Sequence, residues 1–389
     1  MSVKRPIYLD YNATTPVSPE VLEAMLPFFT EYFGNPSSLN HSYGWEAEAG
    51  IEKSREILAG AIAATPSEIV FTSGATEANN LAIKGIAEAY MSKGKHIITV
   101  QTEHNAVLDP CRYLETLGFN ITYLPVHPDG LINLETIEHA FQADTILVSV
   151  MAANNEIGVL QPIEKIGKIC HERNIIFHTD AAQALGKIPL NVERMNIDVL
   201  SMTAHKLYGP KGIGALYVRR KTPRVQLAPQ LHGGGQEKGL RSGTLYTPQI
   251  VGFGEAVRIA TAEMESETEK MGALRDHLWD QLRELPGVHL NGHSTQRLPN
   301  NLNVSIEGVK GSNLLSRVRE AIAISSGSAC SSTNPAPSHV IKALGRSDDL
   351  ARATIRFGLG RTTSEADIER AATIVREQIQ TLRQRKVSV

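Results

Sequence analysis

Runs of apolar, mostly β-branched residues alternate along the first half of the chain with segments whose apolar positions repeat at the helical period. Residues 68–72 (EIVFT) precede a helical pattern, and residues 95–101 (KHIITVQ) predict the next strand. The same order returns where residues 145–151 (TILVSVM) lead to a helix that opens at Pro162, followed by a strand at residues 175–179. Nearly continuous apolar strands separated by helices are typical of a parallel sheet with both faces covered. The pattern therefore predicts an α/β fold.

The pattern changes beyond about residue 262, where a longer helical stripe begins. The apolar positions of this stripe are Met264, Met271, Leu274, Leu278 and Leu282. The segment PGVHLNG then ends the helical pattern. We expect a second domain to begin here. A final helix is predicted to begin after Ser364, a typical N-cap residue. One face of it carries Ile368, Ala371, Val375, Ile379 and Leu382.

The length and net charge of the chain limit its number of domains and the kinds of partner that we expect. A chain of 389 residues with 42% hydrophobic residues can bury a large core and usually forms two domains. The formal net charge of −2 and the pI near 6.7 give no basic field, so we expect neither a nucleic acid nor a membrane surface as a partner. Small or acidic ligands fit this balance better.

The N-terminus and the cysteines indicate the compartment. Residues 1–15 contain no apolar core of signal-peptide length, and no apolar run approaches the roughly 18 residues that a membrane span needs. The three cysteines, Cys111, Cys170 and Cys330, are too few and too scattered for a disulfide framework or a four-thiolate metal site. We therefore expect a cytoplasmic protein in a reducing compartment, with no metal site.

A turn of small residues precedes the first long helix. In FTSGATEANN a strand ends at Ser73 and Gly74, and the helix opens at Ala75 and Thr76, which leaves main-chain N–H groups free to approach an anion. A phosphate would fit there, although Ser-Gly before a helix is more often simple capping. No Lys-Ser/Thr pair follows at the spacing of a Walker loop.

Asp180 follows the strand at residues 175–179 directly, at the carboxyl end where open α/β sheets place their ligands. Gln183 lies one helical turn further on and can face the same crevice. Together they offer a carboxylate for a ring N–H and an amide for a ring oxygen. By itself, Asp180 could equally well cap the next helix.

The segment SMTAHKLYGPKGIGALYV contains a lysine in an unusual setting. Most lysines stay in solvent, but Lys206 lies in a turn of small residues and glycines between an apolar strand and another strand-like run. A lysine that is desolvated beside cations has a lowered pKa and becomes a competent amine for Schiff-base chemistry. Thr203 and His205 add hydrogen-bond donors for a phosphate.

Cys330 lies in ISSGSACSSTNPAPS, a run of serine, glycine and proline between two structured segments. Cys111 and Cys170 fall in helical patterns, and we interpret them as small buried hydrophobes. A thiol on a polar loop is exposed and reachable, which suits a nucleophile or a sulfur carrier. Downstream, Arg356 alternates with apolar neighbours on a predicted strand, where a guanidinium can bind a substrate carboxylate through two hydrogen bonds.

Ten segments, in order, resemble one family. They are YLDYNATTPVSPEV, GNPSS, FTSGATEANNLAIKG, EHNAV, NNEIG, HTDAAQALGKI, AHKLYGPKGIGALYVR, GGGQEKGLRSGT, SSGSACSS and IRFGLGR. The chain is similar to cysteine desulfurases of the NifS/IscS type, the group I branch of the class V aminotransferase-like enzymes, which use pyridoxal 5'-phosphate. The resemblance implies a fold-type I α/β architecture. Its large domain, residues 16–262, would contain a mainly parallel sheet, and residues 1–15 and 263–389 would form a smaller α/β domain.

The resemblance also implies a role for each matching position. The residues expected to hold the cofactor ring are Lys206 through a Schiff base, His104 by stacking, Asp180 at the ring nitrogen and Gln183 at the phenolic oxygen. The residues expected to bind its phosphate are Ala75, Thr76, Thr203 and His205, together with Thr244 of the neighbouring subunit, which implies a homodimer. Asn155 and Arg356 would bind the substrate carboxylate.

In the implied reaction, Lys206 removes the α-proton of L-cysteine, and the Cys330 thiolate takes the sulfur as a persulfide, leaving L-alanine. His104 would handle the proton of the substrate thiol. The sulfur would pass to acceptor proteins such as an iron–sulfur scaffold. The residues after the cysteine, SSTNPAPSHV, and the end of the chain at Val389 depart from the usual family pattern, so the resemblance does not identify the acceptor.

Other functions compete with this one. A selenocysteine lyase, a cysteine sulfinate desulfinase or an ordinary aminotransferase would share the fold, and an aminotransferase would not need Cys330. A sulfur carrier or scaffold protein that keeps the fold without catalysis would not need Lys206. Redox sensing through Cys330 predicts oxidation that is independent of substrate.

Overall fold

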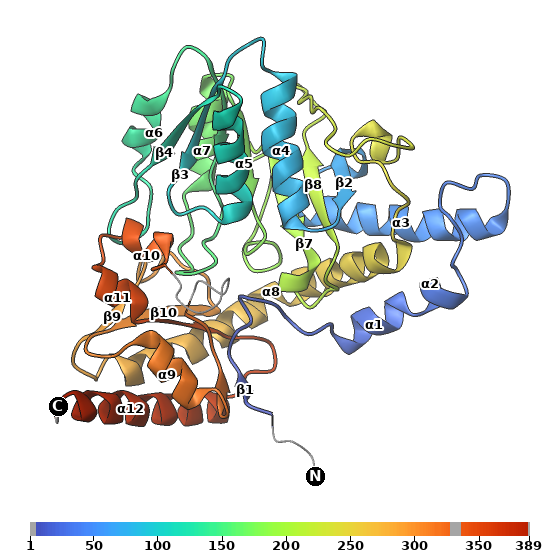
Figure 1. Ribbon diagram of the computed structural model, residues 1–389. Helices are drawn as coiled ribbons and strands as arrows, with labels where there is room; N and C mark the ends of the chain where they lie inside the picture. The colour runs from blue at the N-terminus through green and yellow to red at the C-terminus, as the bar shows by residue number, and fades with distance from the viewer. Residues whose placement is uncertain (1–4, 327–335, 388–389) are drawn as a thin grey trace.

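A seven-stranded sheet forms the centre of the larger part of the molecule (Figure 1). The computed structural model describes residues 5–326 and 336–387, so Cys330 lies outside the described residues. The strand order is β2-β8-β7-β6-β5-β3-β4. These strands are β2 (Ile69–Thr72), β3 (His96–Val100), β4 (Asn120–Leu124), β5 (Thr145–Ser149), β6 (Ile176–Asp180), β7 (Val199–Thr203) and β8 (Gly214–Val218).

The sheet is mainly parallel, as the sequence pattern predicts. Strands β4, β3, β5, β6 and β7 pair in parallel, and β8 runs antiparallel to both β7 and β2. The direction of β8 follows from its connection. Residues 204–213 join it to β7 through a short turn, and a turn of this length can only return the chain antiparallel, whereas a parallel partner needs a longer crossover.

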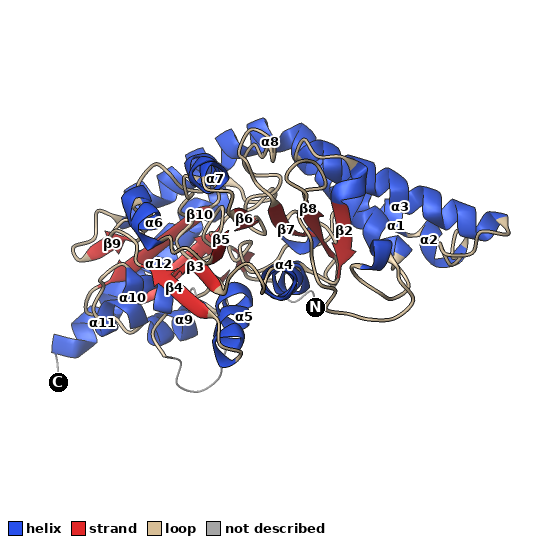
Figure 2. Ribbon diagram, turned by 90° about the horizontal axis from the view of Figure 1, so that it is seen from above, coloured by secondary structure: helices blue, strands red, loops and turns tan. Residues whose placement is uncertain are grey.

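Helices cover both faces of the sheet, and Figure 2 shows the two layers from above. Alternate strand residues point to opposite faces, so Ile98 and Val148 pack with one layer while Ile97 and Leu147 pack with the other. The first layer contains α3 (Ser42–Ala61), α7 (Ile163–Glu172) and the start of α8 (Thr247–Leu282). The second contains α4 (Ala75–Ala89) and α5 (Asn105–Thr116). The remaining helices of this part are α1 (Pro19–Met25), α2 (Pro27–Thr30) and α6 (Leu134–Ala140).

A second, smaller core surrounds an antiparallel sheet in the order β12-β10-β9. Its strands are β9 (Val288–Leu290), β10 (Asn301–Ile306) and β12 (Thr354–Gly358), and β1 (Ile7–Tyr8) pairs in parallel with β11 (Ile322–Ala323). Its helices include α9 (Gly311–Val318) and α12 (Glu365–Val387), while α10 (His339–Ala343) and α11 (Asp348–Arg352) pack in a separate small cluster with Ile157 and Val159. The predicted stripe of α12 is confirmed at Ile368, Ala371, Val375 and Ile379, which are fully buried, and Ser364 Oγ accepts from the N–H of Asp367 as an N-cap should.

The helix expected to begin near residue 264 begins earlier. α8 is a single helix of 36 residues that starts at Thr247, with Pro248 in its first turn. Its first half packs Phe253 and Val257 into the large core, and its last turns pack Leu278 and Leu282 into the small one. The polar residues between belong to the same helix, and most of them are exposed. The division into residues 16–262 and residues 1–15 plus 263–389 stays a prediction.

Side-chain amides tie the smaller sheet to the larger part of the molecule. Asn301 Nδ2 donates to Asn12 Oδ1 at 3.2 Å and to the main-chain oxygen of Glu156 at 3.2 Å. Asn303 Nδ2 donates to the same oxygen at 3.0 Å, and the buried Arg297 donates to the oxygen of Ile157 at 3.1 Å. These bonds are buried, so they fix strand β10 against the segment that follows β5. No helix in the described part of the chain has both the length and the apolar character needed to cross a bilayer.

Gly214 packs closely against the turn before α4, so we expect a side chain at this position to lower the stability of the fold. A Cβ added there would lie 2.5 Å from the oxygen of Met202 and 2.7 Å from main-chain atoms of Gly74, which cannot move independently of the sheet. We expect Gly214→Ala to lower the free energy of unfolding by about 1–3 kcal/mol, the usual range for overpacking. Urea unfolding followed by circular dichroism measures the change.

Gly272→Ala is the matched control. Gly272 lies inside α8, and a Cβ added there would meet no atom within 4 Å. Because alanine loses less conformational entropy in a helix than glycine, this variant should be more stable than the wild type by roughly 0.5–1 kcal/mol. Equal destabilisation of both variants would contradict the packing argument.

Candidate functional site

A cavity of about 650 Å³ opens at the carboxyl ends of the parallel strands, where open α/β sheets bind ligands. The sequence-predicted residues that line it together are Ala75, Thr76, His104, Asn155, Asp180, Gln183, Thr203, His205, Lys206 and Arg356. They come from segments far apart in the chain, and the fold brings them to one place. Thr244 is exposed and does not line this cavity. The predicted role of Cys330 falls outside the described residues.

Lys206 ends the short helical turn η2 (Ala204–Lys206) that follows β7. Its Nζ donates to the main-chain oxygens of Asn12 and Ala13, each at 2.6 Å. Burial, and then the nearby charge of Arg356, lower the pKa of the Lys206 amine to about 8. A larger fraction of this amine is therefore neutral near pH 7 than for a lysine in water, as Schiff-base chemistry requires.

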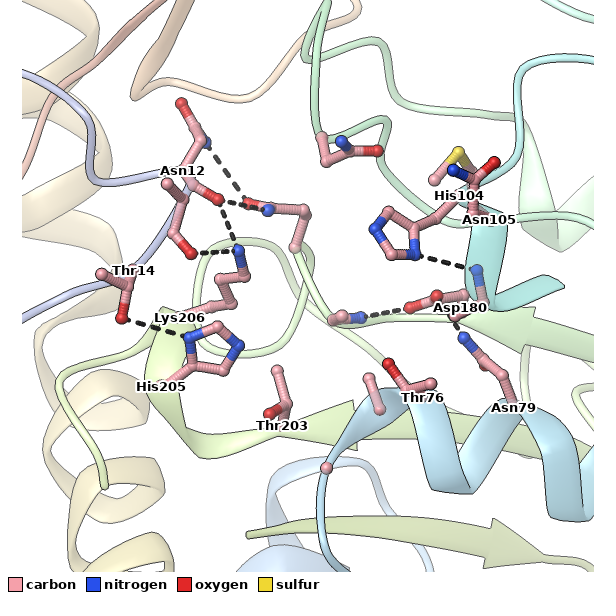
Figure 3. A pocket seen from close by; sticks show the side chains of 18 of the residues that line it. Asn12, Thr14, Thr76, Asn79, His104, Asn105, Asp180, Thr203, His205 and Lys206 are labelled. Carbon is pink, nitrogen blue, oxygen red and sulfur yellow. Dashed lines mark hydrogen bonds between the residues drawn. The ribbon is translucent and has the colours of Figure 1, made fainter. Parts of the chain in front are cut away.

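Asp180 stands at the end of β6 and is only 5% exposed. Its Oδ2 accepts from Asn79 Nδ2 at 2.7 Å, and its Oδ1 accepts from the N–H of Ala182 at 2.8 Å. These two bonds fix the plane of the carboxylate at the cavity wall (Figure 3). A carboxylate held in this way can pair with a protonated ring nitrogen.

Gln183 reaches the same cavity from the first of two successive hydrogen-bonded turns, not from the regular helix that its spacing predicts. Gly186 lies in the second turn, and its φ of +69° favours glycine. Gln183 Nε2 donates to the main-chain oxygen of Asn12 at 2.9 Å, and its Oε1 accepts from Asn12 Nδ2 at 3.3 Å. The amide is therefore oriented by the N-terminal segment.

The start of α4 and the end of β7 meet at the cavity wall, where their donors would suit an anion. Gly74 precedes the helix, so the N–H groups of its first turn open toward the cavity that Thr203 and His205 also line. Burial, and then the charges of three lysines, lower the pKa of His205 to about 4. The ring is thus neutral at pH 7, and its Nδ1 lies 3.2 Å from Thr14 Oγ1.

His104 caps the N-terminus of α5. Its Nδ1 accepts from the N–H of Ala106 at 3.1 Å, so in the neutral ring the proton is on Nε2. Figure 3 shows His104 and Asp180 on one side of the cavity and Lys206 and His205 on the other. This ring is in position to stack on a planar ligand between the two sides.

Arg356 lies on β12, opposite the apolar face formed by Ile355 and Phe357, as its alternation predicts. Its Nη1 donates to the oxygen of Asn155 at 2.8 Å, and its Nη2 pairs with Asp10 at 2.8 Å. Its Nε is buried and has no acceptor among the described residues. A buried donor without a partner is costly, and a bound carboxylate would satisfy it.

Several residues of the site are missed by the sequence reasoning. Asp10 and Asn12 lie in the segment YLDYNATT, Asn79 in SGATEANN and Glu156 in NNEIG. Each lies inside a segment that carries the family resemblance, and that resemblance is the signal that could have identified them. Their contacts, however, join positions 101 to 346 residues apart in the chain, and no local pattern reports such contacts.

These residues fit pyridoxal 5'-phosphate. The cavity offers an amine with a lowered pKa, a fixed carboxylate for the ring nitrogen and a helix N-terminus with neutral donors for the phosphate. Its volume is within the usual range for a small-molecule site. When bound, this cofactor supplies an electron sink for carbanion chemistry at the substrate's α-carbon.

The chain is similar to several known proteins along nearly its whole length. The family described as aminotransferase class-V matches residues 7–371. The chain is 56% identical to the cysteine desulfurase IscS of Neisseria meningitidis serogroup C / serotype 2a, over 99% of this chain and 95% of that protein. A solved NifS-like protein superposes with a TM-score of 0.90 at 39% identity, covering 97% of this chain and all of that one. A structure described as SspA in complex with cysteine superposes with a TM-score of 0.80 at 43% identity, covering 91% of this chain and 98% of that one.

The lowered pKa of Lys206 predicts how fast the cofactor-free protein takes up pyridoxal 5'-phosphate. Only the neutral amine can form the Schiff base, so the rate should rise with pH to about 8 and then level off. An ordinary lysine would keep gaining reactivity up to about pH 10.4. Stopped-flow absorbance of the bound cofactor measures this rate.

The variant Arg356→Gln tests whether the charge of Arg356 contributes to the lowered pKa of Lys206. Removing the guanidinium charge that lowers the Lys206 pKa should move the midpoint of the pH profile upward. If the rate of cofactor uptake by the wild type still rises steeply well above pH 8, the pKa of the Lys206 amine is not lowered as proposed.

Proposed function

Since the chain belongs to the class V aminotransferase family, we propose that it is a cysteine desulfurase that uses pyridoxal 5'-phosphate. It converts L-cysteine to L-alanine and transfers the sulfur to Cys330 as a persulfide. The observation that carries this proposal is the cavity in which the Lys206 amine, the Asp180 carboxylate and the Arg356 guanidinium meet. The long match to proteins named cysteine desulfurase supports the choice of substrate.

Each residue of the cavity has a distinct task in this proposal. The unpaired Nε of Arg356, with the side chain of Asn155, binds the substrate carboxylate. The amine of Lys206 accepts the α-proton, because its lowered pKa leaves a substantial fraction of it neutral near pH 8. Asp180 holds a proton on the cofactor ring nitrogen, and His104 exchanges the proton of the substrate thiol through Nε2.

The sulfur step needs a nucleophile. The thiolate of Cys330 attacks the substrate sulfur, so a sulfur–sulfur bond forms and the carbon–sulfur bond of the substrate breaks. The electron pair of the broken bond stays on the substrate, so the carbon that loses sulfur takes up a proton, the α-carbon regains the proton that Lys206 removed, and alanine leaves. The persulfide then passes to an acceptor protein, for which an iron–sulfur scaffold is our first candidate, and we place the reaction in the cytoplasm.

We also propose a homodimer in which Thr244 binds the cofactor phosphate of the neighbouring subunit. Thr244 is exposed and outside its own chain's cavity, while its loop is anchored by Glu237, which pairs with the buried Arg55 at 2.8 Å. Close to this loop, the ring of Tyr246 lies 6.3 Å from that of Phe29 on α2, which Figure 1 shows at the edge of the molecule. The exposed large apolar side chains of this region are Leu22 on α1, Leu26 between the two helices, Phe29 on α2, Phe33 after it, and Tyr246. Exposed apolar side chains gathered in one region are typical of a subunit interface.

Lys206→Ala and Cys330→Ser should separate the two halves of the reaction. Lys206→Ala should lose both the cofactor's absorbance band and turnover, by roughly 10²–10⁴-fold or more, because it removes the tether and the base together. Cys330→Ser should keep the cofactor band and still respond spectrally to cysteine, yet stop alanine production, since a hydroxyl cannot accept the sulfur. Stopped-flow absorbance and an alanine assay give the two readouts.

Release of alanine by Cys330→Ser at the wild-type rate would contradict the persulfide step and favour a lyase. A wild-type protein without any cofactor band that borohydride bleaches would instead favour a sulfur carrier without catalysis.

Mixed dimers test the place of Thr244. If Thr244 acts in the neighbouring subunit, co-expression of Lys206→Ala with Thr244→Ala should produce mixed dimers in which one site contains both wild-type residues. With random pairing, about a quarter of the wild-type activity should return at limiting cofactor concentration. An activity no greater than the mean of the two single variants would show that Thr244 acts within its own chain or not at all.

A further inference from the structure

A negative charge lies at the end of the cavity where we expect a phosphate to bind. Glu77 stands in the first turn of α4 and lines the cavity. Its Oε2 accepts from the N–H of Ser73, in the turn before the helix, at 2.7 Å. The main-chain donors at this helix end suit an anion. The Glu77 carboxylate already takes one donor of the turn, and its charge would repel a phosphate bound to the others.

The carboxyl group of Glu77 is ionised near pH 7. Burial acts to raise its pKa, but the hydrogen bonds from Arg241 and Ser73 outweigh this effect and lower the pKa below its ordinary value. The charge is favourable at the positive end of the α4 dipole. A phosphate monoester carries a charge of about −1.5 to −2 at pH 7 and competes for the same positive end. An unbalanced Glu77 would therefore weaken phosphate binding.

Arg241 balances this charge. Its Nε donates to Glu77 Oε1 at 2.7 Å, and its Nη2 donates to Oε2 at 3.3 Å. The two side chains are 20% and 18% exposed, so solvent screens the pair less than it screens an exposed ion pair. Arg241 lies three residues before Thr244 and is not among the described residues that line the cavity. Its effect on the cavity therefore passes through Glu77.

The loop that contains Arg241 does not need this ion pair to stay in place. Glu237, four residues earlier, accepts two hydrogen bonds from Arg55 at 2.8 and 2.9 Å. It also accepts from the N–H of Phe71 on β2 at 2.7 Å, and these bonds are buried. Loss of Arg241 should therefore change the charge beside the phosphate more than the course of the loop.

We propose that Arg241 sets the affinity of the site for the phosphate group of its cofactor by neutralising Glu77. This role rests on the proposed function, because it places the phosphate at the start of α4. Arg241 is a positioning residue, since it acts through the Glu77 carboxylate and touches neither cofactor nor substrate. Charge balance predicts opposite results for changes at the two partners, whereas a merely structural ion pair predicts a loss from either change.

The test measures two dissociation constants by absorbance titration of the cofactor-free protein, one for pyridoxal 5'-phosphate and one for pyridoxal. Pyridoxal has the same ring and aldehyde without the phosphate, so it reports damage to the rest of the site. Arg258→Met is the control for Arg241→Met. Arg258 donates to Glu255 on α8 at 2.8 and 2.6 Å, and neither residue is among the described residues that line the cavity.

Arg241→Met should bind pyridoxal 5'-phosphate about tenfold more weakly than the wild type, because the Glu77 carboxylate is then unbalanced. Glu77→Gln should bind it at least as tightly as the wild type, since the amide oxygen can still accept from the N–H of Ser73. The double variant should return to within about threefold of the wild type. Arg241→Lys keeps the charge and should also stay within about threefold.

Pyridoxal should bind within about twofold of the wild type in every variant, and Arg258→Met should match the wild type for both ligands. Should Arg241→Met fail to fold, Arg241→Gln removes the same charge and keeps an N–H donor for Glu77.

Weaker binding of pyridoxal 5'-phosphate by Glu77→Gln, or a double variant as weak as Arg241→Met, would overturn the role of charge and indicate a structural ion pair. Unchanged binding in Arg241→Met would overturn it as well, and so would an equal loss of pyridoxal binding. Failure of the proposed function looks different. In that case, the wild-type protein would bind the cofactor and release no alanine from cysteine, while the dissociation constants would still decide the role of Arg241.

Discussion

Desolvation of one amine is the constraint on which the rest of the site depends. Lys206 Nζ lies at the carboxyl end of the sheet, where it donates to two main-chain oxygens, those of Asn12 and Ala13. A carbonyl dipole stabilises an ammonium less than a carboxylate would, so burial lowers the pKa of the amine to about 8. The amine can then react and exchange protons near neutral pH.

The N-terminal segment that supplies these oxygens is held in place from outside the large sheet. Strand β1 pairs with β11, and the N–H of Tyr11 donates to the oxygen of Gly358 on β12, so the smaller sheet determines where Asn12 and Ala13 lie. Asp10 in the same segment pairs with Arg356. One short stretch of chain thus orients both the amine and the guanidinium. The pKa of Lys206 therefore depends on the packing of both sheets.

Much of the fold and part of the site could be predicted from sequence patterns, for identifiable reasons. The apolar runs at β5 and β6 stand out because both faces of these strands are buried, and Asp180 was placed correctly because it ends such a run. Periodicity reports burial but not strand direction or helix continuity. The antiparallel direction of β8 therefore had to come from the length of its connection to β7, and the unbroken course of α8 could not be predicted. Asn12 illustrates the limit for the site, because it meets Lys206 across 194 positions of the chain.

The most direct test of the account is a single turnover of the cofactor-loaded protein with less than one equivalent of cysteine, without reductant or sulfur acceptor. The alanine released and the mass of the peptide that contains Cys330 are measured in the same sample. The account predicts one additional sulfur atom on Cys330 for each alanine formed. Alanine formed in full amount beside an unmodified Cys330, with the sulfur recovered as free sulfide, would contradict it.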